Sequence, residues 1–207
     1  MVTCLLASVL FAQQNNAPEP RLWFMFFLKG DGKRPSDPKE LEKMQADHIK
    51  NLQTEGAAGH LLAAGPLGDP TQLRRGITIA VAKDRSEVDS FFKSDAFVKA
   101  GIMTVTATAW EPTRVRFNPS YDKNAMEEYV LLITTQSLMR GTRNALCDFA
   151  VGGRTNFSPS EKYQFSGEVW ISRKSDHEKL VAALDGTLAP REIIPLWMAK
   201  DILKPRD

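Results

Sequence analysis

The sequence is poor in cysteine, in histidine and in net charge. Two of its 207 residues are cysteine, three are histidine, and the formal net charge is +2 at pH 7. Proteins that bind nucleic acid usually carry strongly basic domains or stripes, so this balance gives no reason to expect a nucleic-acid partner. His48, His60 and His177 lack the spacing of metal ligands, and two cysteines cannot complete a zinc site. The sequence therefore predicts no bound metal.

A phosphate-binding loop and a membrane-spanning segment are also lacking. The segment Gly65-Pro66-Leu67-Gly68 is a turn pattern, because it has neither the lysine nor the helix start of a phosphate loop. The apolar stretch at residues 1–12 is far shorter than the roughly 20 residues that cross a bilayer as a helix. We therefore predict no cofactor and no membrane span. The remaining composition, 43% hydrophobic and 25% charged, is that of an ordinary globular protein.

Residues 1–12 form an apolar stretch without a charged residue, and a polar, turn-prone segment follows it. An apolar core of this length that ends in a small residue, Ala12, is typical of a secretory signal peptide. We therefore expect a secreted or periplasmic protein, with residues 13–20 as a disordered leader. No lysine or arginine precedes the apolar core, so the alternative is an unstructured leader on a cytoplasmic protein. Removal of Cys4 with the signal would leave Cys147, which we predict to be a buried free thiol.

Residues 21–117 follow the order strand, helix, strand, strand, helix, strand. The predicted elements are a strand at 22–28, a helix from Pro38 to about residue 54, a strand at 61–64 before a turn at Gly65-Pro66, a strand at 76–81, a short helix around 86–92 and a strand at 102–110. Asp37 can cap the first helix, and Pro38 suits its first position. This order is the split βαβ, or ferredoxin-like, arrangement of an α+β protein.

Residues 126–207 repeat this order in a degenerate form after a predicted linker at 118–125. The predicted elements are a strand at 129–133, a helix at 137–150, a strand at 165–172, a helix at 176–184 and a strand at 193–202. A shift of 91 residues places Gly76 on Gly167 and Lys83 on Lys174. Gly152-Gly153 stands where the first copy has its second strand. We therefore predict an internal repeat with a shortened middle.

His48 lies in the middle of the apolar stripe of the first helix. On a helical wheel it shares a narrow arc with Leu41, Met44 and Leu52, which face the predicted sheet. A histidine beside a buried carboxylate can move protons, because imidazole titrates near neutral pH. The alternative is a core histidine without a catalytic role. The candidate carboxylates are Asp47, Asp89 and Asp95, and Asp95 could instead serve as a local cap.

Three motifs near these residues resemble the YciI-like (YCII-related domain) family of the dimeric α/β barrel superfamily, over residues 22–112. They are Ala46-Asp47-His48-Ile49, Ala63-Ala64-Gly65-Pro66 and Ser94-Asp95-Ala96-Phe97-Val98-Lys99-Ala100-Gly101. The family's last motif usually has a proline where Ala96 stands, and an arginine is common in the family where Gln45 stands. The resemblance implies that His48 and Asp95 are the active pair. We also expect Gly65, Pro66 and Phe97 to contact the substrate in an apolar cleft; the alternative for Phe97 is packing in the aromatic core.

The family usually pairs two copies, so that each sheet covers the other in a barrel. Here the second half of the chain can supply that partner, because an isolated ferredoxin-like sheet leaves an apolar face uncovered. We therefore expect two ferredoxin-like halves that form an intrachain dimeric α/β barrel, with further homo-oligomerisation left open. His177 is expected to be exposed and Gly186 falls opposite Asp95, so the site is expected once per chain, with the second copy as a scaffold.

These features predict a small-molecule lyase or isomerase in which Asp95 orients His48 as a general acid/base, without a redox cofactor. Some relatives implied by the resemblance are dehydrochlorinase-type lyases that act on hydroxylated aromatics. The alternative is a non-catalytic ligand-binding or scaffold module of the cell envelope. The enzyme hypothesis requires the side chains of His48 and Asp95 to face each other at a pocket.

Overall fold

The computed structural model describes residues 19–114, 117–156, 166–187 and 191–204. The predicted signal peptide, residues 1–12, and most of the predicted leader lie outside these ranges. In the described part of the chain, no helix has both the length and the apolar character needed to cross a membrane.

The first half of the chain, β1 to β4, has the element order that the sequence predicts, with one additional short helix before the last strand. It contains β1 (Arg21–Lys29), α1 (Pro38–Ala57), β2 (Leu61–Pro66), β3 (Arg74–Ala82), α2 (Arg85–Phe91), α3 (Ala96–Lys99) and β4 (Met103–Pro112). The Asp37 carboxylate accepts the backbone N–H of Lys39 at the start of α1, and Pro38 is the first helical residue. Both roles were predicted, because they depend on residues adjacent in the sequence.

The second half, β5 to β8, repeats the order of the first. It contains β5 (Asp122–Thr134), α4 (Arg140–Leu146), β6 (Ala150–Asn156), β7 (Ser166–Arg173), a short 3-10 helix η1 (Lys174–Asp176), α5 (His177–Ala183) and β8 (Arg191–Lys200). The predicted linker at 118–125 is too long, since β5 already begins at Asp122. Gly152 and Gly153 lie within a full strand, β6, and the helix before it is shorter than predicted.

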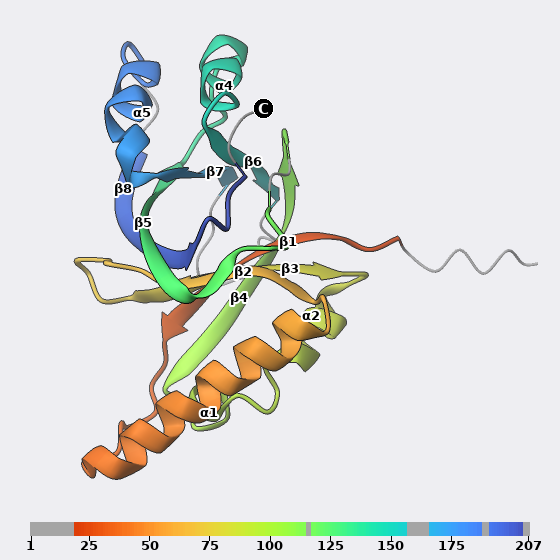
Figure 1. The fold of residues 1–207 in the computed structure, drawn as a ribbon, viewed down its shortest axis with the longest axis vertical. Helices are drawn as coiled ribbons and strands as arrows, with labels where there is room; N and C mark the ends of the chain where they lie inside the picture. The colour runs from red at the N-terminus through yellow and green to blue at the C-terminus, as the bar shows by residue number, and fades with distance from the viewer. Residues whose placement is uncertain (1–18, 115–116, 157–165, 188–190, 205–207) are drawn as a thin grey trace, which may run out of the picture.

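The eight strands form one sheet in the order β2-β3-β1-β4-β6-β7-β5-β8. Each half contributes the same local order, and β4 pairs with β6 to join the two halves. At the other side an antiparallel bridge between Leu67 and Leu196 brings the end of β2 to β8. The predicted intrachain barrel is therefore confirmed. Figure 1 shows α4 and α5 at one end of the molecule and α1 at the opposite end.

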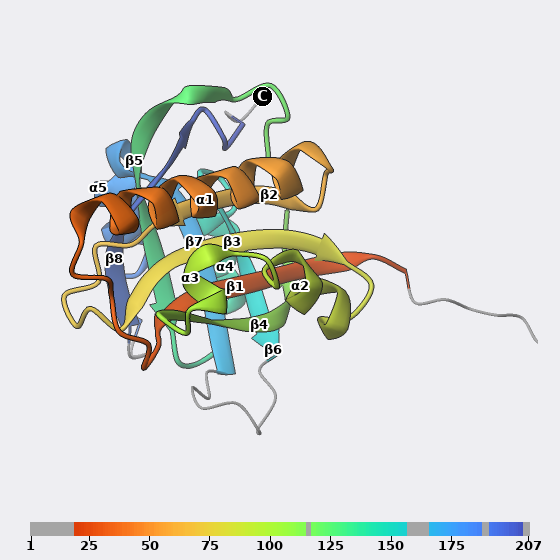
Figure 2. The ribbon, with the colours of Figure 1, turned by 90° about the horizontal axis from the view of Figure 1, so that it is seen from below.

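Side chains of the strands alternate between the barrel interior and the helix-covered faces. In β1, Phe24 and Phe26 point into the barrel core with Leu131 and Ile171 of the second half. The alternate residues of β1 pack under the helices of the first half, which lie in front of the strands in Figure 2. A third core lies under α4 and α5 and contains Cys147, which is 5% exposed and unpaired, as predicted.

Gly65 and Pro66 belong to strand β2, whereas the sequence predicts a turn there. A Cβ atom on Gly65 would lie 1.8 Å from the carbonyl oxygen of Trp197 in β8. The missing side chain therefore allows β2 and β8 to approach where the barrel closes. The backbone N–H of Gly68 donates to the carbonyl of Pro195 at 2.8 Å in the same region. The chain turns only afterwards, at residues 69–72.

Asp69 organises the loop between β2 and β3 and is fully buried. Its carboxylate accepts the backbone N–H groups of Thr71 and Arg74, and the Arg74 Nε at 2.9 Å. Arg74 also contacts Glu192 of the second half. Burial alone would raise the pKa of the Asp69 carboxyl, but the hydrogen bonds from Arg74 and Thr71 hold that pKa well below its usual value. An ionised Asp69 therefore holds Arg74 in the position from which it contacts Glu192 of the second half.

Substitution of Asp69→Asn is expected to lower the free energy of unfolding at pH 7 by about 3 kcal/mol, since it removes the buried carboxylate that pairs with Arg74. The difference from the wild type should be constant at neutral pH. It should shrink as the pH falls below about 4, because the carboxylate of the unfolded chain takes up its proton first. Urea unfolding of both proteins between pH 2.5 and 7 measures this; a difference that does not change with pH would contradict it.

Candidate active site

A cavity of about 660 Å³ lies beside α1 and β2, and both halves of the chain contribute to its wall. Its lining residues are Phe27, Gln45, His48, Ile49, Leu52, Gln53, Gly56, Ala57, residues 61–66, Arg75, Gly76, Ile77, Met103, Tyr121, Asn124, Met126, Ala199 and Ile202. Its volume is within the range of small-molecule sites, about 300–1,000 Å³. The wall is mostly apolar, with few polar groups.

His48 reaches this cavity from the buried face of α1. It is the buried residue of that helix, 8% exposed, and its Nδ1 lies 2.6 Å from Oδ2 of Asp95. The sequence predicts this pair, and the structure brings its members into hydrogen-bond contact. The other two candidate carboxylates have different partners, because Asp47 pairs with Lys43 and Asp89 with Arg85.

Asp95 is completely buried behind His48 and does not line the cavity. It is the N-cap of α3, and its Oδ1 accepts the backbone N–H groups of Phe97 at 3.0 Å and Val98 at 3.2 Å. The two roles considered for Asp95, a local cap and a partner of His48, are therefore both present, one on each oxygen. Because α3 fixes the carboxylate, the imidazole is held in one orientation.

Two aromatic rings enclose the imidazole of His48. Phe27 and Phe97 contact it edge-on, with centroid distances of 5.4 Å and 5.5 Å. The Nε2 atom has no hydrogen-bond partner among the residues that the structure describes, and His48 lines the cavity. With Nδ1 engaged by Asp95, Nε2 is the ring nitrogen that a ligand can meet.

The other predicted contact residues divide into two groups. Gly65 and Pro66 line the cavity from β2, whereas Phe97 is fully buried and touches His48 from behind. Reasoning from the sequence missed Arg75 on β3 and Asn124 on β5, which also line the cavity. No local motif marks them, since they reach the cavity only through sheet pairing and closure of the barrel.

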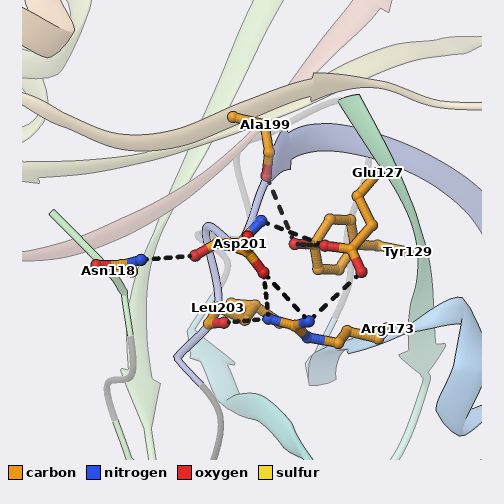
Figure 3. Close-up of polar contacts among 7 residues, drawn as sticks. All are labelled: Asn118, Glu127, Tyr129, Arg173, Ala199, Asp201 and Leu203. Carbon is orange, nitrogen blue, oxygen red and sulfur yellow. Dashed lines mark hydrogen bonds and ion pairs between the residues drawn. The ribbon is translucent and has the colours of Figure 1, made fainter. Parts of the chain in front are cut away.

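A polar network holds the part of the wall that the second half supplies (Figure 3). The Arg173 guanidinium donates to the carbonyl of Leu203 at 2.7 Å and contacts the Asp201 carboxylate at 3.4 Å. Asp201 has a left-handed backbone, with φ of 60°, and stands between two residues of the wall, Ala199 and Ile202. The network therefore fixes the chain at the point where it leaves β8 and borders the cavity.

Glu127 and Tyr129 complete this network. The Tyr129 hydroxyl donates to Glu127 at 2.9 Å, and Glu127 also accepts the backbone N–H of Asp201. Burial and the hydrogen bond to Glu127 raise the pKa of Tyr129 above its usual value, so the phenol stays protonated. The second half thus contributes to the cavity wall as well as covering the first sheet.

The His48–Asp95 pair has no copy in the described part of the second half. His177 begins α5, but it is half-buried rather than exposed as predicted. Gly186, opposite Asp95 in the repeat, has a left-handed backbone with φ of 72°. Among residues 19–114, 117–156, 166–187 and 191–204, no three histidine, cysteine or acidic side chains gather as metal ligands.

Residues 24–110 match the model of the YCII-related domain, within the range in which the sequence resembles that family. No curated protein matches the chain. Among solved structures, the 5-chloro-2-hydroxyhydroquinone dehydrochlorinase of Burkholderia phenoliruptrix AC1100 is 26% identical, over 44% of this chain and 93% of its own, with a TM-score of 0.33.

Two other structures match most of the chain. A mutant chlorite dismutase from Candidatus Nitrospira defluvii is 12% identical over 87% of this chain and 92% of its own, with a TM-score of 0.53. A candidate monooxygenase from Lactobacillus acidophilus NCFM is 11% identical over 91% of this chain and 100% of its own, with a TM-score of 0.52. At these identities the likeness concerns the fold. Residues 24–110 thus match the YCII-related domain, within a chain that has the fold of the dimeric α/β barrel proteins.

Proposed function

We propose that the protein is a small-molecule lyase or isomerase in which His48 is the general acid/base and Asp95 orients it. The observation that supports this most is the 2.6 Å contact between His48 Nδ1 and Asp95 Oδ2 beside a cavity of ligand size. A histidine that only filled the core would be packed on all sides, whereas His48 lines a cavity. Here the imidazole is oriented on one side and accessible on the other.

The contact with Asp95 supports Nε2 as the nitrogen of His48 that acts in this proposal. An ionised Asp95 carboxylate can only accept a hydrogen bond, so we propose the tautomer of the neutral imidazole that has its proton on Nδ1 and its lone pair on Nε2. A general base needs a lone pair within reach of the substrate proton, and the proposed site provides it at the cavity wall. When Nε2 takes up a proton, the adjacent carboxylate stabilises the imidazolium.

In an elimination, Nε2 removes a proton from a substrate carbon, and the electron pair of that C–H bond forms the new double bond. The leaving group departs from the adjacent carbon with its own bonding pair, and the imidazolium returns its proton to that group or to water. In an isomerisation the same proton returns to a different carbon. Neither reaction transfers electrons between the substrate and another molecule, so the proposal requires no redox cofactor.

Substitution of His48→Gln is expected to lower turnover at least about 100-fold, because it removes the general base. The assay uses a panel of hydroxylated and halogenated aromatics with the purified full chain. His60→Gln is the matched control, since His60 also contacts a carboxylate, Glu55, at 2.7 Å but does not line the cavity. Turnover that is equal in the His48 variant and the wild type would refute the proposed role.

The alternative function is a non-catalytic ligand-binding module of the cell envelope. It predicts that compounds bind in the cavity but are recovered unchanged after long incubation. The panel separates the two proposals, because product formation that depends on His48 occurs only with an enzyme. The proposed location outside the cytoplasm is tested separately by N-terminal sequencing of the protein from its host, where an intact Met1 would contradict export.

A further inference from the structure

Among the residues of the cavity wall that the structure describes, Arg75 is the one with a permanent charge. Among the lining residues that the structure describes, no aspartate or glutamate is present, and Asp95 lies behind His48. Most of the rest of the wall is apolar, including Leu52, Leu61, Leu62, Ala63, Ile77 and Met103. A cationic ligand would find no counter-charge in this lining, whereas an anionic ligand would find the guanidinium.

Arg75 is held in place without being neutralised. Its Nη1 donates to the side-chain oxygen of Gln72 at 2.8 Å, and Gln72 is a neutral partner. No other acceptor contacts its guanidinium within the described part of the chain. The neighbouring Arg74 is different, because it contacts both Asp69 and Glu192. Of these two adjacent arginines, one therefore joins the halves and the other keeps donors available for a ligand.

The residue that holds Arg75 has a strained backbone. Gln72 has a φ of 60°, in the left-handed region that residues other than glycine rarely adopt. Such conformations persist only where the surrounding structure imposes them, and they cluster at functional sites. Here the Gln72 N–H donates to the carbonyl of Asp69 at 3.0 Å, and the buried Asp69 carboxylate fixes the rest of the loop. The loop is thus a rigid support for Gln72 and Arg75.

We infer that the cavity takes a small organic anion with an apolar, ring-sized body, and that Arg75 binds its carboxylate. This inference rests on the proposed function, since it names the substrate class of the same site. The planar guanidinium offers paired N–H donors that match the two oxygens of a carboxylate. The apolar wall receives the ring, and Arg75 acts as the specificity-determining residue that selects anions.

The test is isothermal titration of the full-length protein with benzoate and with its neutral analogue benzamide. The wild type is expected to prefer benzoate, and Arg75→Gln should weaken benzoate binding about tenfold or more while leaving benzamide unchanged. Arg75→Lys, which keeps the charge, should retain the preference for the anion. Arg154→Gln removes an exposed arginine outside the cavity and should bind benzoate within about twofold of wild type.

Three results would overturn the inference. The wild type could fail to prefer benzoate, Arg75→Gln could keep the preference, or Arg154→Gln could lose as much affinity as Arg75→Gln. Benzoate has no leaving group, so its binding is independent of turnover. Loss of the anion preference in Arg75→Gln together with unchanged turnover in His48→Gln would therefore support the anion site while refuting the proposed chemistry.

Discussion

Replacement of Asp95 by asparagine is expected to lower turnover by about 10³- to 10⁴-fold with little change in the fold. The asparagine oxygen can still accept the N–H groups of Phe97 and Val98 and so keep the cap of α3. Its amide group then faces Nδ1 of His48 as a donor. The imidazole must present a lone pair to that donor, which moves its own proton to Nε2 and removes the base from the cavity.

Steady-state turnover on any substrate found with the aromatic panel measures this effect. Asp47→Asn is the matched control, because Asp47 is an exposed carboxylate of the same helix that pairs with Lys43. The control is expected to stay within about twofold of wild type, as surface substitutions usually do. An Asp95→Asn enzyme with nearly full turnover would show that the carboxylate only caps α3.

Substitution of Gly65→Ala is expected to destabilise the protein by about 3 kcal/mol or more. The added Cβ would lie 1.8 Å from the carbonyl oxygen of Trp197, a backbone atom that cannot move aside alone. Strands β2 and β8 would have to separate, which would strain the Gly68 to Pro195 hydrogen bond and the Leu67–Leu196 bridge. The expected loss of stability therefore comes from weaker contacts between β2 and β8, where the barrel closes.

Thermal and urea unfolding of the purified variant measure this loss. Gly141→Ala is the control, since no atom lies within 4 Å of a Cβ placed there and the residue is in helix α4. Alanine has a higher helix propensity than glycine, so the stability of the control should be unchanged or higher by up to about 1 kcal/mol. Equal stability of the Gly65 variant and the wild type would mean that β2 and β8 are not in close contact.

The sequence predicts the elements whose signals are local. Strand β1 is apolar on both faces because one face meets the barrel core and the other meets the helices. Helix α1 begins where Asp37 and Pro38 place its start. The fold class follows from the order of such elements, together with the resemblance to a family whose sheets pair.

The elements that the sequence predicts poorly depend on contacts between the halves. Gly65-Pro66 has the pattern of a turn, yet it continues β2 because β8 lies against it. Residues 122–124 are polar, but they begin β5, in which Asp122 pairs with Lys200 of β8. Gly152 continues β6 because Trp170 fills the space where a side chain would be. Local propensity gives way to tertiary pairing at each of these positions.

The candidate site divides in the same way. His48 and Asp95 are 47 residues apart, but helical periodicity and a motif mark each of them, so their contact could be predicted. Neither periodicity nor a sequence motif indicates a role for Arg75 or Asn124. They reach the cavity because β3 begins beside the loop that Asp69 organises and because β5 begins beside the cavity. Only the closed barrel places these side chains in one wall.

The tautomer of His48 tests the central claim most directly. Nitrogen-15 NMR of the wild type is expected to show a proton on Nδ1 and none on Nε2 at pH 8, with the His48→Gln variant assigning the signal. In Asp95→Asn the proton should move to Nε2. A wild-type imidazole that carries its proton on Nε2 would contradict the account, because no base would then face the cavity.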